Sequence, residues 1–243
     1  MIVSHNELVT AVNKAFLGMR RTCGEADVVA NMVADLQMVG LDGVHHFNNA
    51  SNYLNVEMDC PADIESVGID SLKVDLHRCS LACHLPIIID YALEKMVGSK
   101  QLTLTLNNCH NRWLAYSELV KLAAKGIACR ATWANGSSPN RILYVLNRGC
   151  IAPELYFSDV TTYDKASLHC MTIELSITDF SLEESSQGYS RHMASNVLQN
   201  VQQTAWQEGI FVDDVEWETL KETATVFLVE NSQRSRQGAG EVV

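Results

Sequence analysis

Leu102-Thr103-Leu104-Thr105-Leu106-Asn107-Asn108-Cys109-His110 is the stretch that decides the fold of this chain. Leucine and threonine alternate through it, which is typical of a β-strand with one apolar face. The strand ends at two asparagines, and a helical pattern begins again at Trp113. Open α/β sheets bind their ligands at the carboxyl ends of strands, beside helix N-termini. His110 is therefore the first candidate for chemistry in this chain.

Apolar residues at helical spacing dominate the chain before this strand. Ser4-His5-Asn6-Glu7 is a capping box that opens one helix, and Thr22-Cys23-Gly24-Glu25 predicts the capping box of a second. Gly40 and Gly43 are expected to end the second helix, and a third, poorer helix follows. We therefore predict a helical N-terminal part over residues 1–60.

Strands and helices alternate after this helical part, which predicts a sheet with parallel pairs. Residues 61–230 are expected to form an α/β domain whose C-terminal helices return to the helical part, and residues 231–243 a flexible tail. The fold class is α/β, with a mixed sheet flanked by helices. The expected strands are 69–76, 102–106, 127–133, 142–146, 154–157 and 171–177, and the expected helices are 80–96, 113–125, 190–208 and 215–229.

The composition is that of a globular protein and limits the partners of the chain. It has 243 residues, of which 47% are hydrophobic, and a formal charge of -11. So acidic a chain is not expected to bind nucleic acid or an anionic membrane surface. The sequence shows no apolar run of transmembrane length and no signal-peptide pattern at its N-terminus. We therefore expect a cytoplasmic protein that binds a small molecule.

Several common sites are excluded by their missing motifs. The chain has no G-x-G-x-x-G and no P-loop, so a Rossmann fold is not expected. The eight cysteines form no C-x-x-C pair, so we expect free thiols and no metal site. Cys109 could be a nucleophile, because a helix N-terminus lowers the pKa of a thiol. The simpler interpretation is that Cys109 packs in the core.

His110 is a stronger candidate, because it lies on a polar turn between Asn108 and Asn111. A histidine in this position can transfer a proton or orient a ligand. Asp42 is unusual as well, since it lies among glycines where a helix ends. From the sequence alone, a turn residue is the simpler interpretation of Asp42.

Three segments resemble the malate/L-lactate dehydrogenase family, a non-Rossmann family that also contains ureidoglycolate, sulfolactate and cyclic imino-acid enzymes. The helix and turn that end at Asp42-Gly43-Val44 are similar to the family's Asp-Ser-His-Gly-Val motif. Asn107-Asn108-Cys109-His110, with the helix and strand after it, resembles the family's second histidine motif. Asn135-Gly136-Ser137-Ser138-Pro139 is similar to its cofactor loop.

This resemblance implies a helical part joined to an unusual α/β domain, a homodimer, and reduction of a 2-oxo or imino acid with NAD or NADP. His110 matches the catalytic acid–base histidine of the family. Asn135 and Ser137 fall in the loop that would bind the cofactor. The chain looks like a shortened, diverged bacterial relative, and the missing part falls in the second half of the chain.

Two positions depart from the family pattern. Asp42 stands where the first motif has a histidine, and His46 stands where an arginine would hold the substrate carboxylate. An ionised Asp42 would repel a carboxylate by about 4 kcal/mol at a separation of ~4 Å. We therefore expect Asp42, His46 and His110 to share a site that suits a cationic or neutral ligand.

These departures favour a relative with a lost or altered cofactor site, acting as a small-molecule-binding or interaction protein. The alternative is an active oxidoreductase on an amino or imino compound, with His110 as its acid–base group. A third interpretation is a hydrolase or lyase with Cys109 as nucleophile. Binding of NAD(H) or NADP(H), read as a rise in melting temperature, separates the first two.

Overall fold

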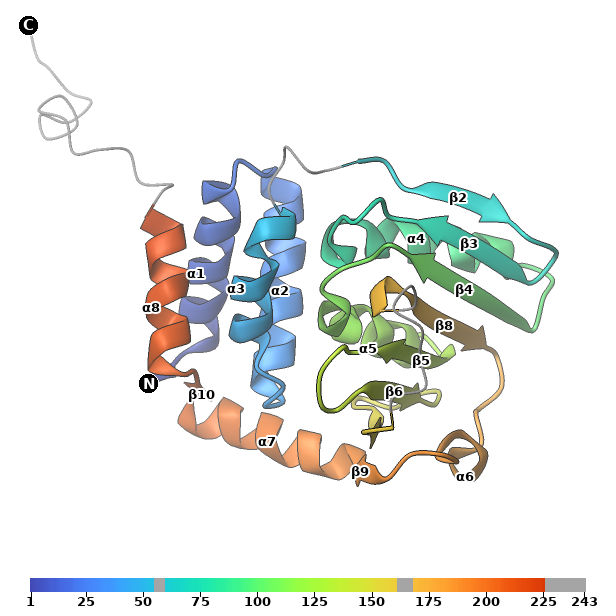
Figure 1. Cartoon of the computed structure of the whole chain (residues 1–243). Coiled ribbons are helices and arrows are strands. Elements are labelled where there is room, and N and C mark those ends of the chain that lie inside the picture. Colours follow the sequence, from blue (N-terminus) through green and yellow to red (C-terminus); the bar gives the residue numbers. More distant parts are fainter. Residues whose placement is uncertain (55–59, 161–167, 226–243) are drawn as a thin grey trace, which may run out of the picture.

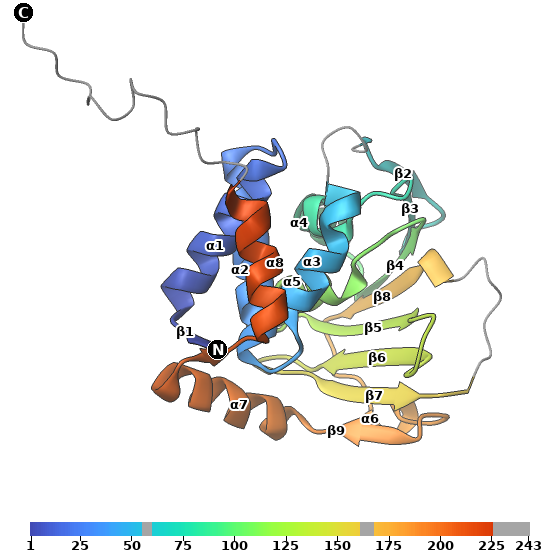
Figure 2. The same cartoon turned by 60° about the vertical axis from the view of Figure 1, so that its left-hand side comes forward.

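The computed structural model describes residues 1–54, 60–160 and 168–225. The helical side of the molecule consists of α1 (His5–Gly18), α2 (Cys23–Met38), α3 (Gly43–Leu54) and α8 (Asp214–Thr225). A sheet forms the other side (Figure 1). The C-terminal helix α8 stands beside α1, although the two lie at opposite ends of the chain (Figure 2). The three helices that the sequence predicts in its first part are all present.

The start of α1 is the capping box that the sequence predicts. Ser4 Oγ accepts a bond from the Glu7 amide, and the Glu7 carboxylate accepts one from the Ser4 amide at 2.7 Å. The second predicted capping box is wrong, because Thr22 makes no side-chain cap bond at the start of α2. Glu25 instead accepts a bond from Arg21 Nη2 at 3.0 Å. A charge-assisted bond to a buried guanidinium is stronger than a bond to a backbone amide.

The turn between α2 and α3 shows two different uses of glycine. Gly40 follows the end of α2 with a φ of +78°, so it stops that helix as predicted. Gly43 is instead the first residue of α3. A Cβ on Gly43 would overlap the Val33 carbonyl oxygen and lie 2.8 Å from the Gln37 amide nitrogen, both on α2. The close approach of α3 to α2 therefore requires glycine at this position.

The sheet has eight strands in the order β2-β3-β4-β8-β5-β6-β7-β9. They are β2 (Asp63–Ser66), β3 (Ser71–Asp75), β4 (Gln101–Asn107), β5 (Ala128–Ala134), β6 (Arg141–Leu146), β7 (Glu154–Ser158), β8 (Met171–Ser176) and β9 (Arg191–Met193). Only β3 and β4 are parallel among the described strand pairs. α4 (Leu81–Lys95) and α5 (Tyr116–Ala124) lie between the sheet and α2 (Figure 1). The predicted mixed sheet flanked by helices is confirmed.

The position of β8 corrects one expectation. It lies between β4 and β5 and is antiparallel to both, so that Ile173 pairs with Leu104 on one side and with Ala131 on the other. The expected parallel pairing is therefore right for β3 and β4 and wrong for β5. Alternation of apolar residues identifies a strand and its buried face, but it does not specify the neighbouring strands.

The end of the sheet corrects a second expectation. The sequence predicts one helix over residues 190–208, but β9 precedes α7 (Ser195–Glu208). The Glu154 carboxylate of β7 lies 2.6 Å from His192 Nε2 on β9 and accepts a bond from Ser195 Oγ at 2.7 Å. This carboxylate ties β9 to the sheet and fixes the residue at which α7 begins.

One hydrophobic core joins the two sides of the molecule. Leu36 of α2, Leu119 of α5 and Leu104 of β4 are completely buried within it. α7 runs back from β9 to the helical side, where α8 follows (Figure 2). None of the described helices is long and apolar enough to cross a membrane. The predicted tail, residues 231–243, lies outside the described residues.

Between α7 and α8 the chain forms a short connection to its own N-terminus. β10 (Ile210–Phe211) pairs with β1 (Ile2–Val3). Asp213 then caps α8, since its Oδ1 accepts a bond from the amide of Val215 at 2.9 Å. The sequence predicts a helix from residue 215, and α8 begins one residue earlier, at Asp214.

Candidate functional site

His110 lies on a tightly bonded turn at the carboxyl end of β4. Asn108 has a φ of 50°, which asparagine tolerates better than most residues, and its side chain donates to both oxygens of Asp75 at 3.0 and 2.9 Å. The His110 amide donates to the Cys79 carbonyl at 3.1 Å, and the Leu81 amide donates to the His110 carbonyl at 2.9 Å. The backbone of His110 is therefore fixed to the loop between β3 and α4.

The imidazole of His110 lies between two other rings. Tyr53 of α3 stacks on it with ring centroids 3.8 Å apart, and His169 lies 4.7 Å away at a tilted angle. All three rings are partly exposed. Neither ring nitrogen of His110 has a hydrogen-bond partner within the described ranges, whereas His45, His77 and His192 each pair with a carboxylate. The nitrogens of His110 are therefore available to a ligand.

The surroundings of His110 are electropositive. Burial, His169, Arg112 and Arg78 lower the pKa of His110 to about 4. Burial and the same two arginines also lower the pKa of His169. Both rings are therefore neutral at pH 7. Among the residues that the structure describes, the charged side chains that act on the two rings are these two arginines and no acidic group.

Arg112 connects the ends of two strands beneath these rings. Its Nη1 donates to the Cys109 carbonyl at 2.9 Å and its Nη2 to the Ala134 carbonyl at 3.1 Å, so the guanidinium links the ends of β4 and β5. Its Nε is buried and has no partner among the residues that the structure describes. Burial lowers the pKa of Arg112 somewhat, but a guanidinium stays charged at pH 7. Two backbone carbonyl oxygens and the Cys109 thiol thus surround the Arg112 guanidinium in the described part of the chain.

His46 forms a second ring contact on the same face of α3. It stacks on Trp113 at 5.1 Å, and burial together with His45 lowers the pKa of His46 to about 4. Trp113 Nε1 donates to Asn135 Oδ1 at 3.4 Å. His46 and Tyr53 are seven residues apart on α3, which places both on one helix face. Two ring stacks therefore join α3 to the sheet side, one at His46 and one at Tyr53.

Asp42 does not join this group of residues. It is exposed and lines a groove of about 430 Å³ between the end of α2 and α7. It precedes Tyr53 by 11 residues, which is roughly 16 Å along a helix. The expectation that Asp42 faces His110 and repels carboxylates is therefore wrong. The resemblance to the family motif assigned Asp42 to the site by its position in the sequence. In the structure, Asp42 precedes the first residue of α3, whereas Tyr53 near the other end of that helix contacts His110.

The turn after β5, which holds the predicted cofactor residues, is bonded within itself. The Asn135 amide donates to the Asn140 carbonyl at 2.8 Å, and the Asn135 side chain is occupied by Trp113. Ser138 Oγ donates to the Asp159 carboxylate at 2.6 Å, while Ser137 is exposed. The Asp159 carboxylate also pairs with Arg191 at 3.3 Å, so this turn has a positive and a negative group beside it. The assignment of Asn135 and Ser137 to cofactor binding stays a prediction.

The structure also weighs against Cys109 as a nucleophile. Its side chain is completely buried, and burial raises the pKa of the Cys109 thiol to about 11. The reactive form of cysteine is the thiolate, which such a thiol does not supply at pH 7. The structure therefore disfavours the hydrolase or lyase alternative, which needs Cys109 as its nucleophile. Within the described residues, no group of three histidines, cysteines or carboxylates could hold a metal ion.

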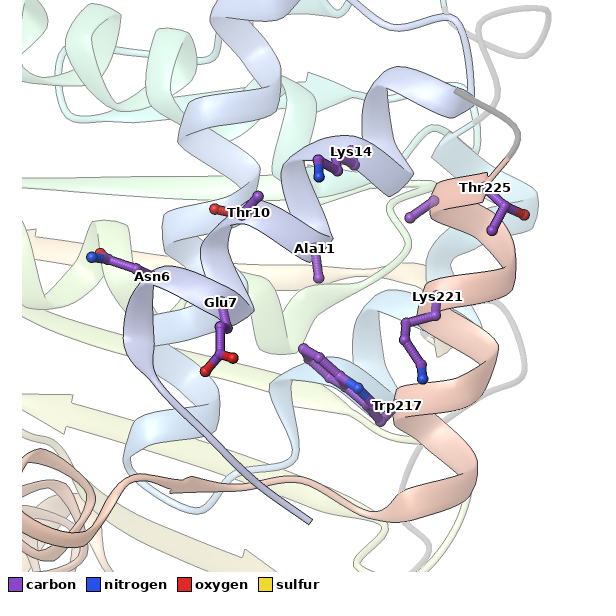
Figure 3. Close-up of a pocket in the computed structure, with 9 residues that line it drawn as sticks. Asn6, Glu7, Thr10, Ala11, Lys14, Trp217, Lys221 and Thr225 are labelled. Atoms are coloured by element: carbon purple, nitrogen blue, oxygen red, sulfur yellow. The ribbon is translucent and has the colours of Figure 1, made fainter. Parts of the chain in front are cut away.

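A larger groove lies far from this chemistry, between α1 and α8. It has a volume of about 490 Å³, and Trp217 reaches from α8 toward Ala11 of α1 (Figure 3). Two of its charged groups have partners of their own, since Glu7 caps α1 and Lys221 pairs with Glu218 at 2.7 Å. None of the predicted site residues lines this groove. The candidate functional site is therefore the cluster around His110.

Four residues of this cluster were missed by sequence reasoning: Tyr53, Arg78, Arg112 and His169. A usable signal existed for Tyr53, because its spacing from His46 places both on one face of α3. No local pattern marks the other three. They reach His110 from the β3–α4 loop, from the turn after His110 and from the residues before β8.

Comparison with known proteins supports the fold. Residues 3–81 match a family model described as a protein of unknown function (DUF3726). No curated protein sequence matches the chain. A dehydrogenase from Sinorhizobium meliloti superposes with a TM-score of 0.70 at 9% identity, covering 92% of this chain and 99% of that one. Malate dehydrogenase from Pyrococcus horikoshii OT3 gives 0.71 at 10% identity, covering 95% and 96%.

A third solved structure extends the likeness to reductases. Delta1-piperideine-2-carboxylate reductase from Pseudomonas syringae pvar. tomato superposes with a TM-score of 0.64 at 11% identity, covering 92% of this chain and 99% of that one. Identities this low show the fold alone. The resemblance that the sequence predicts is therefore confirmed for the fold, which is that of the malate and lactate dehydrogenases.

Proposed function

We propose that this protein, a diverged relative of dehydrogenases with the same fold, binds a small molecule at the cluster of His110, Tyr53 and His169. The observation that carries the proposal is the state of His110. Its ring is neutral, partly exposed and stacked on Tyr53, and neither of its nitrogens has a partner within the described residues. A fixed ring with two free nitrogens at the end of a parallel strand pair is suited to hold a ligand.

A second candidate function is reduction of a carbonyl or imine, with His110 as the proton donor. The named activities of the structural neighbours favour it, since they are dehydrogenases and a reductase. The pKa of His110 disfavours it, because a group with a pKa of about 4 carries a proton in about one molecule in a thousand at pH 7. Binding without hydride transfer is therefore our first proposal.

A thermal-shift panel tests the proposed binding site. We expect at least one of L-malate, pyruvate and L-proline, at millimolar concentration, to raise the melting temperature of the wild-type protein by about 5 °C. The shift should be absent from His110→Ala. It should persist in His192→Gln, which removes an exposed histidine elsewhere on the sheet. An equal shift in His110→Ala would rule out the cluster as the site.

The same panel with NADH and NADPH separates the two candidate functions. Binding alone predicts no loss of absorbance at 340 nm when a cofactor is mixed with a 2-oxo acid. If the wild-type protein consumes NADH or NADPH and His110→Ala does not, the function of the site is reduction and not binding alone.

A further inference from the structure

The hairpin of β2 and β3 forms one edge of the sheet, and β2 is the outermost strand that the structure describes there (Figure 1). All four residues of β2 are exposed, so little apolar packing holds this strand. It pairs with β3 in antiparallel register, in which Asp63 lies opposite Asp75. The stability of this edge therefore depends on the contacts that join the two strands at the open end of the hairpin.

Two contacts join the chain segments at this open end. His77 Nε2 lies 2.9 Å from Asp63 Oδ2, and the amide of Cys60 donates to the Sγ of Cys79 at 3.3 Å. The second contact follows from the register, because Cys60 comes three residues before Asp63 and Cys79 comes four residues after Asp75. The two cysteines thus lie side by side across the end of the hairpin.

This contact gives the two cysteines a spacing that is compatible with a disulfide. The N–Cα bond adds about 1.5 Å to the 3.3 Å between the Cys60 nitrogen and the Cys79 sulfur, so the Cys60 Cα lies within about 5 Å of that sulfur. The two Cα atoms of a disulfide are about 4.4–6.8 Å apart. A bond between the two sulfurs therefore requires side-chain rotation and little movement of the backbone.

The two thiols differ in exposure, and this difference sets the order in which they react. Cys60 is exposed, whereas Cys79 is only 1% exposed. An oxidant in solution therefore meets Cys60 first, and Cys79 reacts with a sulfur that is already beside it. The carbonyl oxygen of Cys79 also accepts a bond from the His110 amide at 3.1 Å, which holds Cys79 in place.

We propose that Cys60 and Cys79 are a modification site, at which a low-molecular-weight disulfide such as glutathione disulfide oxidises them to a reversible intramolecular disulfide. The Cys60 thiolate attacks one sulfur of the oxidant, so that a mixed disulfide forms, the S–S bond of the oxidant breaks and one thiolate leaves. The Cys79 thiolate then attacks the Cys60 sulfur, and the second thiolate leaves. The two protons of the cysteine thiols end on the two released thiols, and the oxidant gains the two electrons that the cysteines lose. This site is independent of the proposed function.

Equilibration of the protein with glutathione disulfide, followed by blocking of the remaining thiols and peptide mass mapping, tests the site. We expect two of the eight cysteine thiols to be lost and Cys60 to be linked to Cys79. The bond closes a loop of about 20 residues, so the melting temperature should rise by about 5–10 °C. Dithiothreitol should reverse both changes.

Single serine variants identify the two partners. Cys60→Ser should abolish both the link and the rise in melting temperature, and because Cys60 is exposed the variant should fold like the wild type. Cys23→Ser removes another exposed cysteine and should keep both effects. Cys83→Ser should keep them as well, and it is needed because cleavage at arginine and lysine leaves Cys79 and Cys83 on one peptide.

Four outcomes would overturn the assignment of this pair. They are retention of all eight thiols, glutathione that stays on Cys60, a link from Cys60 to Cys83, and a disulfide between two copies of the chain. The thermal-shift comparison of wild-type protein with His110→Ala decides the proposed function separately, because it is made with the cysteines reduced.

Discussion

Gly43→Ala is expected to lower the free energy of unfolding by about 3 kcal/mol, at the upper end of the range for overpacked sites. A Cβ at this position would overlap the Val33 carbonyl oxygen and lie 2.8 Å from the Gln37 amide nitrogen. Both atoms belong to the backbone of α2, so no side-chain rotation can relieve the overlap. α3 must move away from α2, and the change is measurable by urea denaturation followed by circular dichroism.

Gly24→Ala is the matched control for this substitution. Gly24 is also in a helix, but a Cβ there would meet nothing within 4 Å. Alanine has the higher helix propensity, so this variant should be more stable than the wild type by about 0.5–1 kcal/mol. Replacing glycine by alanine is thus expected to lower the free energy of unfolding at position 43 and to raise it at position 24. A Gly43→Ala protein as stable as the wild type would show that α3 is not packed against the backbone of α2.

The displacement of α3 should also affect the candidate site. His46 and Tyr53 are both carried by α3 and stack on rings of the sheet side. A shift of the helix by a fraction of an ångström changes both stacks at once. Gly43→Ala should therefore weaken the binding of any ligand at His110 and also lower the stability of the fold. A purely local packing defect would lower the stability alone.

Local pattern was sufficient to predict most elements of the fold. The strand of β4 and the capping box of α1 depend on residues that are close together in the sequence, so periodicity and caps identify them. The insertion of β8 between β4 and β5 was not predictable in this way. Its apolar face fits several neighbours equally well, and the choice among them is made by the packing of the whole sheet.

The candidate site was only partly predictable for a related reason. His110 was identified because a strand end and a helix start flank it directly. His169 is 59 residues from His110 in the sequence, and nothing in its immediate neighbours indicates that the two meet. For Tyr53, 57 residues from His110, the helical spacing from His46 was the one usable signal. Asp42 was placed wrongly by motif position, because a motif gives the order of residues along the chain and not the direction in which the next helix runs. Three-dimensional packing supplies this missing information.

Acid should destabilise the protein through His46, and His46→Phe should remove much of this effect. Burial and His45 lower the pKa of His46 from 6.5 to about 4 in the folded protein. The unfolded chain therefore binds more protons than the folded one between these values, so stability is retained above pH 6.5 and is lost as the pH falls toward 4. For this single group the loss between pH 7 and pH 4.5 is about 2.5 kcal/mol.

Two variants separate titration of His46 from its packing on Trp113. Neither phenylalanine nor glutamine at position 46 can ionise. Phenylalanine keeps a ring stacked on Trp113, whereas glutamine has no ring and removes this stack. Both should therefore lose about 2.5 kcal/mol less than the wild type between pH 7 and pH 4.5, although His46→Gln should be the less stable of the two at pH 7. His110 has a similarly lowered pKa and remains in both variants, so some acid sensitivity persists. A His46→Phe protein with the full acid sensitivity of the wild type, measured by urea denaturation at both pH values, would mean that His46 is accessible to solvent and that α3 does not cover Trp113.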